Sequence, residues 1–304
     1  KTDRIDALKI ASFALDKWIK LLEYTPAETT CKTLQIMNHQ CIKLNKMLVM
    51  QKNSLIALLD CCFPNANTLF TSPRRESDGH EKWVDFVLKF PHVDFVAKLP
   101  LSVFKIKYQS WCKKERYKYS ESKAEQIHAY ARTLVSTLPM TDAVRKMVSD
   151  SAKLLNSILE ALGVLRSEMD ALASQLPEYE TVMNLFAVGK VTCSQLIAEI
   201  GDVTKLKSGK SLVALAGIDP PPNQSGKEDK KSRSISKCGS PALRKTLFLI
   251  MTIYLQRQPI DEPVYQFLDK KRTEGKPYKV YMIAAARKFL RIYYARVKEV
   301  MPME

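Results

Sequence analysis

Apolar residues recur every three or four positions along most of this chain, which is the spacing of one face of an α-helix. Residues 1 to about 22 show it first, with apolar side chains at Ile5, Leu8, Ala11, Leu15 and Ile19. No comparable stretch alternates apolar and polar residues as a half-buried strand does. The pattern predicts a mainly α fold that opens on a helix.

Two longer stretches carry apolar residues at alternating steps of three and four, the spacing of a heptad seam. The first ends before Pro64 and has Gln51 at one seam position, and its apolar members are Leu34, Met37, Cys41, Leu44, Leu48, Leu55 and Leu58. The second ends at Pro177 and comprises Val148, Leu155, Ile158, Leu162, Leu165, Met169, Leu172 and Leu176. The pattern predicts two long helices, each with one apolar stripe.

Such helices can pair within one chain or between two chains. Because the faces opposite the seams are polar, we favour a protruding coiled-coil hairpin over the core of a helical bundle, which stays the alternative. Between the seams, Trp83, Phe86 and Phe90 predict short packed helices. The segment 105–118 mixes aromatic and basic residues, a composition that can bind RNA or can cover a small core.

In the last third of the chain, an apolar helical run at 212–216 stops at Gly217, and Pro220, Pro221 and Pro222 cannot continue it. A polar and mostly basic segment follows, and a new helix is predicted from Ser240-Pro241. Two further helices have apolar stripes, at Leu243, Leu247, Ile250 and Tyr254, and at Ile283, Ala286, Leu290 and Tyr293. Arg244, Lys279 and Arg287 lie off these stripes, where they are candidate phosphate contacts.

The net charge of the chain is +16, and residues 201–304 hold 21 Lys and Arg against 10 Asp and Glu. This concentration favours a nucleic acid as partner over a general contribution to solubility. The seven cysteines form no CxxC pair and show no metal-ligand spacing with the four histidines, which favours reduced thiols in a cytoplasmic protein. No apolar run is long enough for a membrane span.

Two sets of residues are candidates for chemistry. Ser225 stands beside Gly226 in the basic segment, where its hydroxyl is placed to attack a phosphate; a solvated surface loop is the alternative interpretation. Asp3 and Asp6 are three residues apart on the first predicted helix, so both carboxylates face one side. Two such carboxylates can share Mg²⁺, although the same spacing is common on a solvated face.

Five runs in the C-terminal half, in matching order and spacing, resemble one family. They are AEIGD at 198–202, LVALAGIDP, NQSG, ISKCGSPALRKTL and EGKPYKVYMIAAARKFLRIYYA, and the opening KTDRIDA resembles the motif that closes the same family's acidic site. The family comprises the Piv/MooV-type DNA invertases and insertion-sequence transposases, some of them guided by a structured RNA. The resemblance covers nearly the whole chain.

The resemblance implies a DNA transposase or recombinase that cuts and rejoins DNA through a serine–DNA link, with Ser225 as nucleophile. It assigns Asp3 and Asp6 to a four-carboxylate, Mg²⁺-binding site on a RuvC-like, ribonuclease-H fold. It also implies a helix-hairpin-helix-like turn at Gly189 that offers backbone N–H groups to phosphate; here Phe186-Ala187 replace the usual first Pro-Gly, so a purely structural connection is an equal alternative. Lys237 joins Arg244, Lys279 and Arg287 as an expected nucleic-acid contact.

The expected domains are a remnant of the RuvC-like domain at 1–26, a helical coiled-coil linker at 27–180 and a transposase domain at 181–304. Expected partners are DNA, a guide RNA as some relatives use, and further copies of the chain in a dimer or tetramer. Because two of the four carboxylates would precede Lys1, we expect this segment alone to be inactive. The alternative function is a truncated module that binds nucleic acid and oligomerises.

Overall fold

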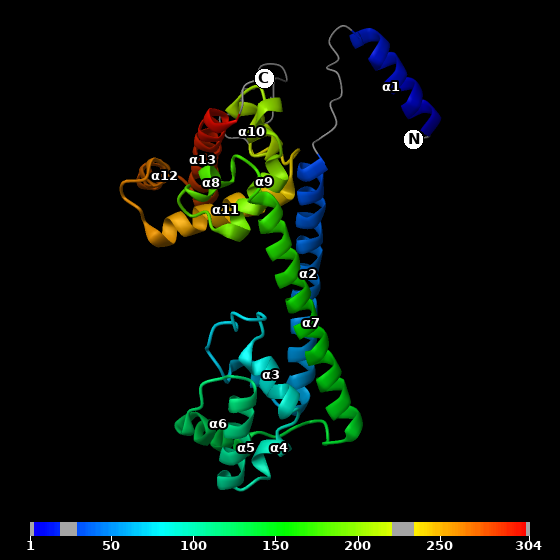
Figure 1. Cartoon of the computed structure of the whole chain (residues 1–304), viewed down its shortest axis with the longest axis vertical. Coiled ribbons are helices and arrows are strands. Elements are labelled where there is room, and N and C mark those ends of the chain that lie inside the picture. The colour runs from blue at the N-terminus through cyan, green and yellow to red at the C-terminus, as the bar shows by residue number, and fades with distance from the viewer. Residues whose placement is uncertain (1–2, 19–28, 221–233, 302–304) are drawn as a thin grey trace.

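The computed structural model describes residues 3–18, 29–220 and 234–301, and these residues contain helices but no strand. The mainly α prediction is therefore confirmed for the described part. The helix α1 runs over Asp3–Lys17, close to the predicted range, and its side chains are described from residue 5 onward. Ile5, Leu8 and Leu15 are more than half exposed, so the predicted stripe of α1 is not covered by the rest of the chain. Figure 1 shows α1 apart from the other helices.

The two seams form the long helices α2, at Thr29–Cys62, and α7, at Asp142–Ala173. They lie side by side and antiparallel (Figure 1), with Gln51 Nε2 donating to Ser151 Oγ at 2.8 Å and Arg166 Nη2 to Asn45 Oδ1 at 3.4 Å. Leu34, Leu48 and Leu55 on α2, like Val148, Leu155 and Leu162 on α7, are buried. The seams thus cover each other within one chain and are no argument for a second copy. Helix α7 ends before Leu176, the last residue of the predicted seam.

A small helical module comprising residues 63–141 connects α2 to α7. It contains the one-turn η2 at Ala66–Thr68, α3 at Lys82–Lys89, α4 at Asp94–Ala97, α5 at Leu101–Lys114 and α6 at Glu121–Thr133. Aromatic rings fill its centre: Phe86 is fully buried and its ring centroid lies 5.7 Å from that of Trp111. Tyr108 is also fully buried and Trp111 is 4% exposed, so these two aromatics of segment 105–118 cover a core and are not free to stack on RNA bases.

The remaining helices pack together at the other end of the α2–α7 pair (Figure 1). They are α8 at Tyr179–Met183, α9 at Lys190–Ile200, η3 at Val203–Lys205, α10 at Gly209–Leu215, α11 at Pro241–Arg257, α12 at Pro263–Thr273 and α13 at Tyr278–Val300. Both predicted stripes are confirmed. All four residues of the predicted stripe on α11 are buried. On α13, Ala286, Leu290 and Tyr293 are buried and Ile283 is half-buried. Helix α9 contacts both α2 and α7, so it joins this unit to the long pair.

Candidate functional site at a backbone crossing

Two backbone segments cross directly after α10. Gly217 follows the helix with a φ of +60°, which suits a residue without a side chain. The returning segment passes so close that a Cβ on Gly239 would lie 2.1 Å from the carbonyl oxygen of Leu215. A Cβ on Gly217 would lie 2.5 Å from the backbone nitrogen of Gly239. Each position therefore requires glycine for the two segments to meet.

Hydrogen bonds close this crossing. The backbone nitrogen of Ser236 donates to Asp219 O at 2.8 Å, that of Lys237 to Gly217 O at 3.0 Å, and that of Ser240 to Leu215 O at 2.8 Å. The Ser236 hydroxyl also donates to Asp219 Oδ1 at 2.7 Å. The crossing thus fixes both ends of the segment 220–235, which contains Ser225, at one place in the fold. Ser225 itself lies outside the described residues.

Two arginines hold the crossing from the neighbouring helices. From α11, Arg244 Nη1 donates to the carbonyl oxygens of Ala216 and Gly239, both at 3.0 Å. From α13, Arg287 donates to Ile218 O through Nε at 2.9 Å and through Nη2. Burial, followed by repulsion from Arg291, lowers the pKa of Arg287, and Asp219 opposes that change. The guanidinium groups therefore bind backbone carbonyls here, and their predicted contacts with phosphate stay predictions.

A buried carboxylate supports the same place from below. Glu199 of α9 is 6% exposed, and its two oxygens accept hydrogen bonds from Asn38 Nδ2 of α2 at 2.8 Å and from the Ser240 hydroxyl at 2.5 Å. Ser240 caps α11, because its oxygen also accepts from the backbone nitrogen of Leu243 at 3.0 Å. Glu199 thus ties three helices together. Glu199 belongs to the run AEIGD, but the sequence alone predicted no role for it.

The other predicted site residues lie in different surroundings. Gly189 is exposed and precedes α9 as its N-terminal cap residue, and the helix-hairpin-helix-like turn with its phosphate contact stays a prediction. Lys237 and Lys279 are exposed. Asp6 is exposed on α1, away from the crossing (Figure 1), and the side chain of Asp3 lies outside the described part. The structure therefore gathers Lys237, Arg244 and Arg287 but does not bring Asp6 to them.

The described residues do not by themselves fit a metal site. They contain no cluster of three or more His, Cys, Asp and Glu side chains that could hold an ion. All seven cysteines lie in the described part, and no disulfide joins any two of them. No helix of the described part is long and apolar enough to cross a bilayer.

The crossing lies within the part of the chain that is similar to known proteins. Residues 179–266 match the model of the Transposase IS116/IS110/IS902 family. The chain is therefore similar to transposases of this family over that part of its length. Over 118 residues, 38% of the chain, it is 33% identical to the pilin gene-inverting protein of Moraxella bovis, and equally to that of Moraxella lacunata. It is 22% identical over 162 residues, 53% of the chain, to an uncharacterized 43.6 kDa protein of insertion element IS110 from Streptomyces coelicolor. These alignments span 36% and 39% of the relatives' own lengths.

Replacing Arg287 with methionine is expected to lower the free energy of unfolding by about 2 kcal/mol, because it removes a charge-assisted bond to a buried backbone carbonyl. The control is Arg291→Met, since Arg291 is exposed one turn further along α13; it should change stability by less than about 0.5 kcal/mol. Urea denaturation measures both. Equal stabilities for the two variants would show that Arg287 does not hold the crossing.

Proposed function

We propose that this chain is part of a DNA recombinase of a mobile element, which cuts and rejoins DNA through a covalent bond between Ser225 and a DNA phosphate. The observation that carries the proposal is the crossing, which holds the two ends of the Ser225 segment between cationic side chains. The transposase-family match over 179–266 and the pilin gene-inverting proteins support DNA recombination as the reaction class. The excess of basic residues after 201 supports DNA as substrate.

The proposed reaction exchanges one phosphodiester for another. The Ser225 oxygen attacks phosphorus, the bond from phosphorus to a deoxyribose oxygen breaks, and the serine proton is transferred away while the leaving oxygen gains one. Because the new ester conserves the energy of the broken bond, a DNA hydroxyl can reverse the step and rejoin the strands. Cationic side chains beside the segment, such as Lys237, would stabilise charge on the phosphoryl oxygens.

Metal binding by Asp3 and Asp6 belongs to this proposal by resemblance. Asp6 alone is a single exposed carboxylate, and Mg²⁺ prefers several oxygen ligands, so further carboxylates would have to come from outside the described residues. A guide RNA, a dimeric or tetrameric assembly and a cytoplasmic location complete the proposal, and they rest on the same resemblance.

Ser225→Ala is expected to abolish strand exchange when it is introduced into the full product of the gene. The affinity for DNA should stay within about twofold, because the substitution removes no charge. Ser234→Ala is the control, since it removes a neighbouring hydroxyl of the same basic segment and should leave strand exchange intact. Recombination of a paired-site plasmid and DNA binding by fluorescence anisotropy measure the two effects. Strand exchange by the Ser225→Ala variant would overturn the assignment of the nucleophile.

A further inference from the structure

A second cationic site lies in the 63–141 module, at the end of the α2–α7 pair opposite the crossing (Figure 1). A cavity of about 360 Å³ opens between the segment 70–74, the start of α3 and Lys52 of α2. Its lining contains three cationic side chains, Lys52, Arg74 and Lys82, and one carboxylate, Glu81. The cavity therefore has an excess of positive charge.

Glu81 is fully occupied by its neighbours. One oxygen accepts from Lys52 Nζ and from the Trp83 indole, both at 2.6 Å, and the other accepts from Arg74 Nη2 at 3.0 Å. No carboxylate of the described chain pairs with Lys82, whose Nζ donates to the backbone oxygen of Lys118 at 3.3 Å. Lys52 and Arg74 share this one carboxylate, so one excess positive charge remains on their group and a second lies on Lys82, which has no carboxylate partner among the described residues.

Lys82 is held between two aromatic rings. Its Nζ lies 5.1 Å from the ring centre of Phe70 and 5.2 Å from that of Tyr117, and Lys123 Nζ lies 5.9 Å from the same Phe70 ring. Burial, together with repulsion from Lys123, lowers the pKa of Lys82. An anion in the cavity would relieve both effects, because it pairs with a partly desolvated ammonium group.

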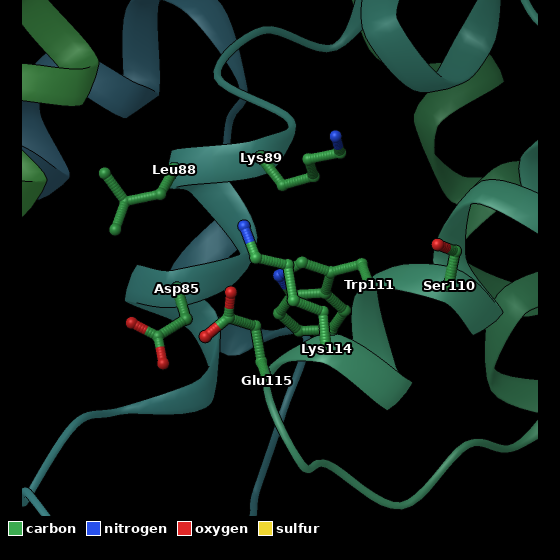
Figure 2. A pocket seen from close by; sticks show the side chains of 7 residues that line it. All are labelled: Asp85, Leu88, Lys89, Ser110, Trp111, Lys114 and Glu115. Carbon is green, nitrogen blue, oxygen red and sulfur yellow. The ribbon is translucent and has the colours of Figure 1, made fainter.

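A second cavity in the same module provides the contrast. It measures about 210 Å³ and lies between α3 and α5, and Figure 2 shows its lining. Here two lysines, Lys89 and Lys114, are balanced by two carboxylates, Asp85 and Glu115. The first cavity has the cationic excess that this one lacks.

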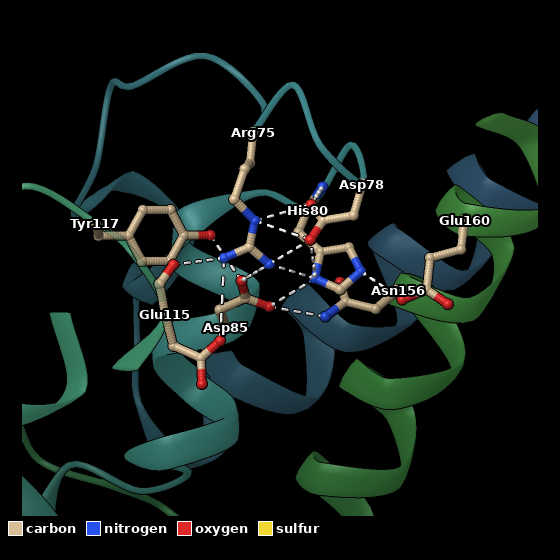
Figure 3. Close-up of polar contacts among 8 residues, drawn as sticks. All are labelled: Arg75, Asp78, His80, Asp85, Glu115, Tyr117, Asn156 and Glu160. Atoms are coloured by element: carbon tan, nitrogen blue, oxygen red, sulfur yellow. Dashed lines mark hydrogen bonds and ion pairs between the residues drawn. The ribbon is translucent and has the colours of Figure 1, made fainter. Parts of the chain in front are cut away.

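Polar contacts anchor Arg75, the residue that follows Arg74 of the first cavity (Figure 3). Arg75, next to the lining residue Arg74, points away into the module, where it donates to Asp78 Oδ1 at 2.9 Å and to the backbone oxygen of Glu115 at 2.7 Å. It also pairs with the buried Asp85 at 3.3 Å. The neighbouring segment is thereby anchored before any ligand binds, which lowers the ordering cost of binding.

We propose that this cavity binds a phosphate of a nucleic-acid backbone, with Lys82 as its main cationic contact, Arg74 at its edge and Lys123 close by, over the Phe70 ring that lines the cavity. Exposed hydroxyls of Thr71 and Ser72 add hydrogen-bond donors at the same wall. Lys52 at the cavity lies 14 residues after Asn38, which bonds Glu199 below the crossing, so the two sites are roughly 20 Å apart along the axis of α2. One polynucleotide of sufficient length can then contact both ends of the molecule. The site does not depend on the chemistry of Ser225.

Cross-linking tests the location. A photoreactive benzoylphenylalanine at Thr71 samples this cavity, and the same residue at Ser110 samples the charge-balanced one; both positions are exposed. With labelled single-stranded DNA, single-stranded RNA or duplex DNA as probes, Thr71 is expected to cross-link and Ser110 is not. The three probes show which backbone the cavity prefers. No cross-link at Thr71 with any probe, or equal cross-linking at both positions, overturns the proposal.

Charge removal tests the contacts. Lys82→Gln with Lys123→Gln should abolish the Thr71 cross-link and lower the affinity for single strands about tenfold. The salt slope should fall by about 0.7, because one phosphate contact of a single strand is lost. Lys89→Gln with Lys114→Gln removes the same charge from the same module and should change neither. If the Lys82 variant melts early, Arg74→Gln replaces it, because the Arg74 side chain is 45% exposed. Unchanged affinity and cross-linking in a folded variant would contradict the site.

Discussion

Gly239→Ala is expected to lower the free energy of unfolding by about 3 kcal/mol, because a Cβ would lie 2.1 Å from the carbonyl oxygen of Leu215 and the two segments would have to separate. In a chain of this size the midpoint of thermal unfolding should fall by roughly 6 °C or more. The separation would break the bonds of Lys237 and Ser240 to the first segment, so recombination should also be lost. Calorimetry measures the first effect, and hydrogen exchange of the amides at 236–240 locates it.

The matched control is Gly163→Ala. Gly163 lies on the exposed face of α7 with no atom within 4 Å of the added Cβ, so alanine should raise stability by about 0.5–1 kcal/mol. If the two substitutions change stability in opposite directions, the loss at Gly239 comes from the steric clash there and not from a general effect of the added methyl group. If Gly239→Ala proved as stable as Gly163→Ala, the close crossing would be wrong.

Asp85→Ala is expected to lower the free energy of unfolding by about 3–5 kcal/mol. The substitution removes a buried carboxylate that is the shared partner of one cationic side chain and several polar groups. Asp85 is 5% exposed and accepts from the Tyr117 hydroxyl at 2.6 Å and from Asn156 Nδ2 at 2.8 Å. It also pairs with Arg75 at 3.3 Å and with His80 at 3.2 Å (Figure 3). Without it, the Arg75 charge and the Asn156 amide lose an acceptor inside the module.

Asp142→Ala is the control for Asp85→Ala. The Asp142 side chain is 95% exposed and pairs only with the exposed Arg145, so its loss should cost less than about 1 kcal/mol. Urea denaturation followed by tryptophan fluorescence measures both variants, because Trp83 and Trp111 lie in the same module. A loss of similar size in both variants would show that the buried contacts contribute little.

The periodic sequence predicted the long helices well, because a repeated apolar face is a local property. The stripes of α2, α7 and α11 are buried almost as predicted. The partner of each stripe was not predictable, since a heptad seam fits a helix of the same chain and one of another chain equally well. The structure pairs α2 with α7, which removes the main physical reason for expecting an oligomer.

The details of the candidate site depend on contacts between distant residues, so the sequence could not predict them. From the sequence, Gly239 looks like an ordinary turn residue. Only the structure shows that the carbonyl oxygen of Leu215 lies where its side chain would be. Arg244 and Arg287 read as phosphate contacts because a sequence shows a cation but not the backbone oxygens it binds. The sequence did contain one signal for Glu199, which is a carboxylate among the apolar residues of α9. A carboxylate that is buried requires polar partners, so a structural role could have been expected.

The central claim is that the segment fixed by the crossing carries the nucleophile. Its most direct test is to trap the covalent protein–DNA adduct during strand exchange, digest it with protease and map the modified peptide by mass spectrometry. The assignment of Ser225 as the nucleophile requires a single adduct on Ser225 that is absent from the Ser225→Ala variant. An adduct on Ser234, on Ser236 or outside residues 220–240 would contradict it.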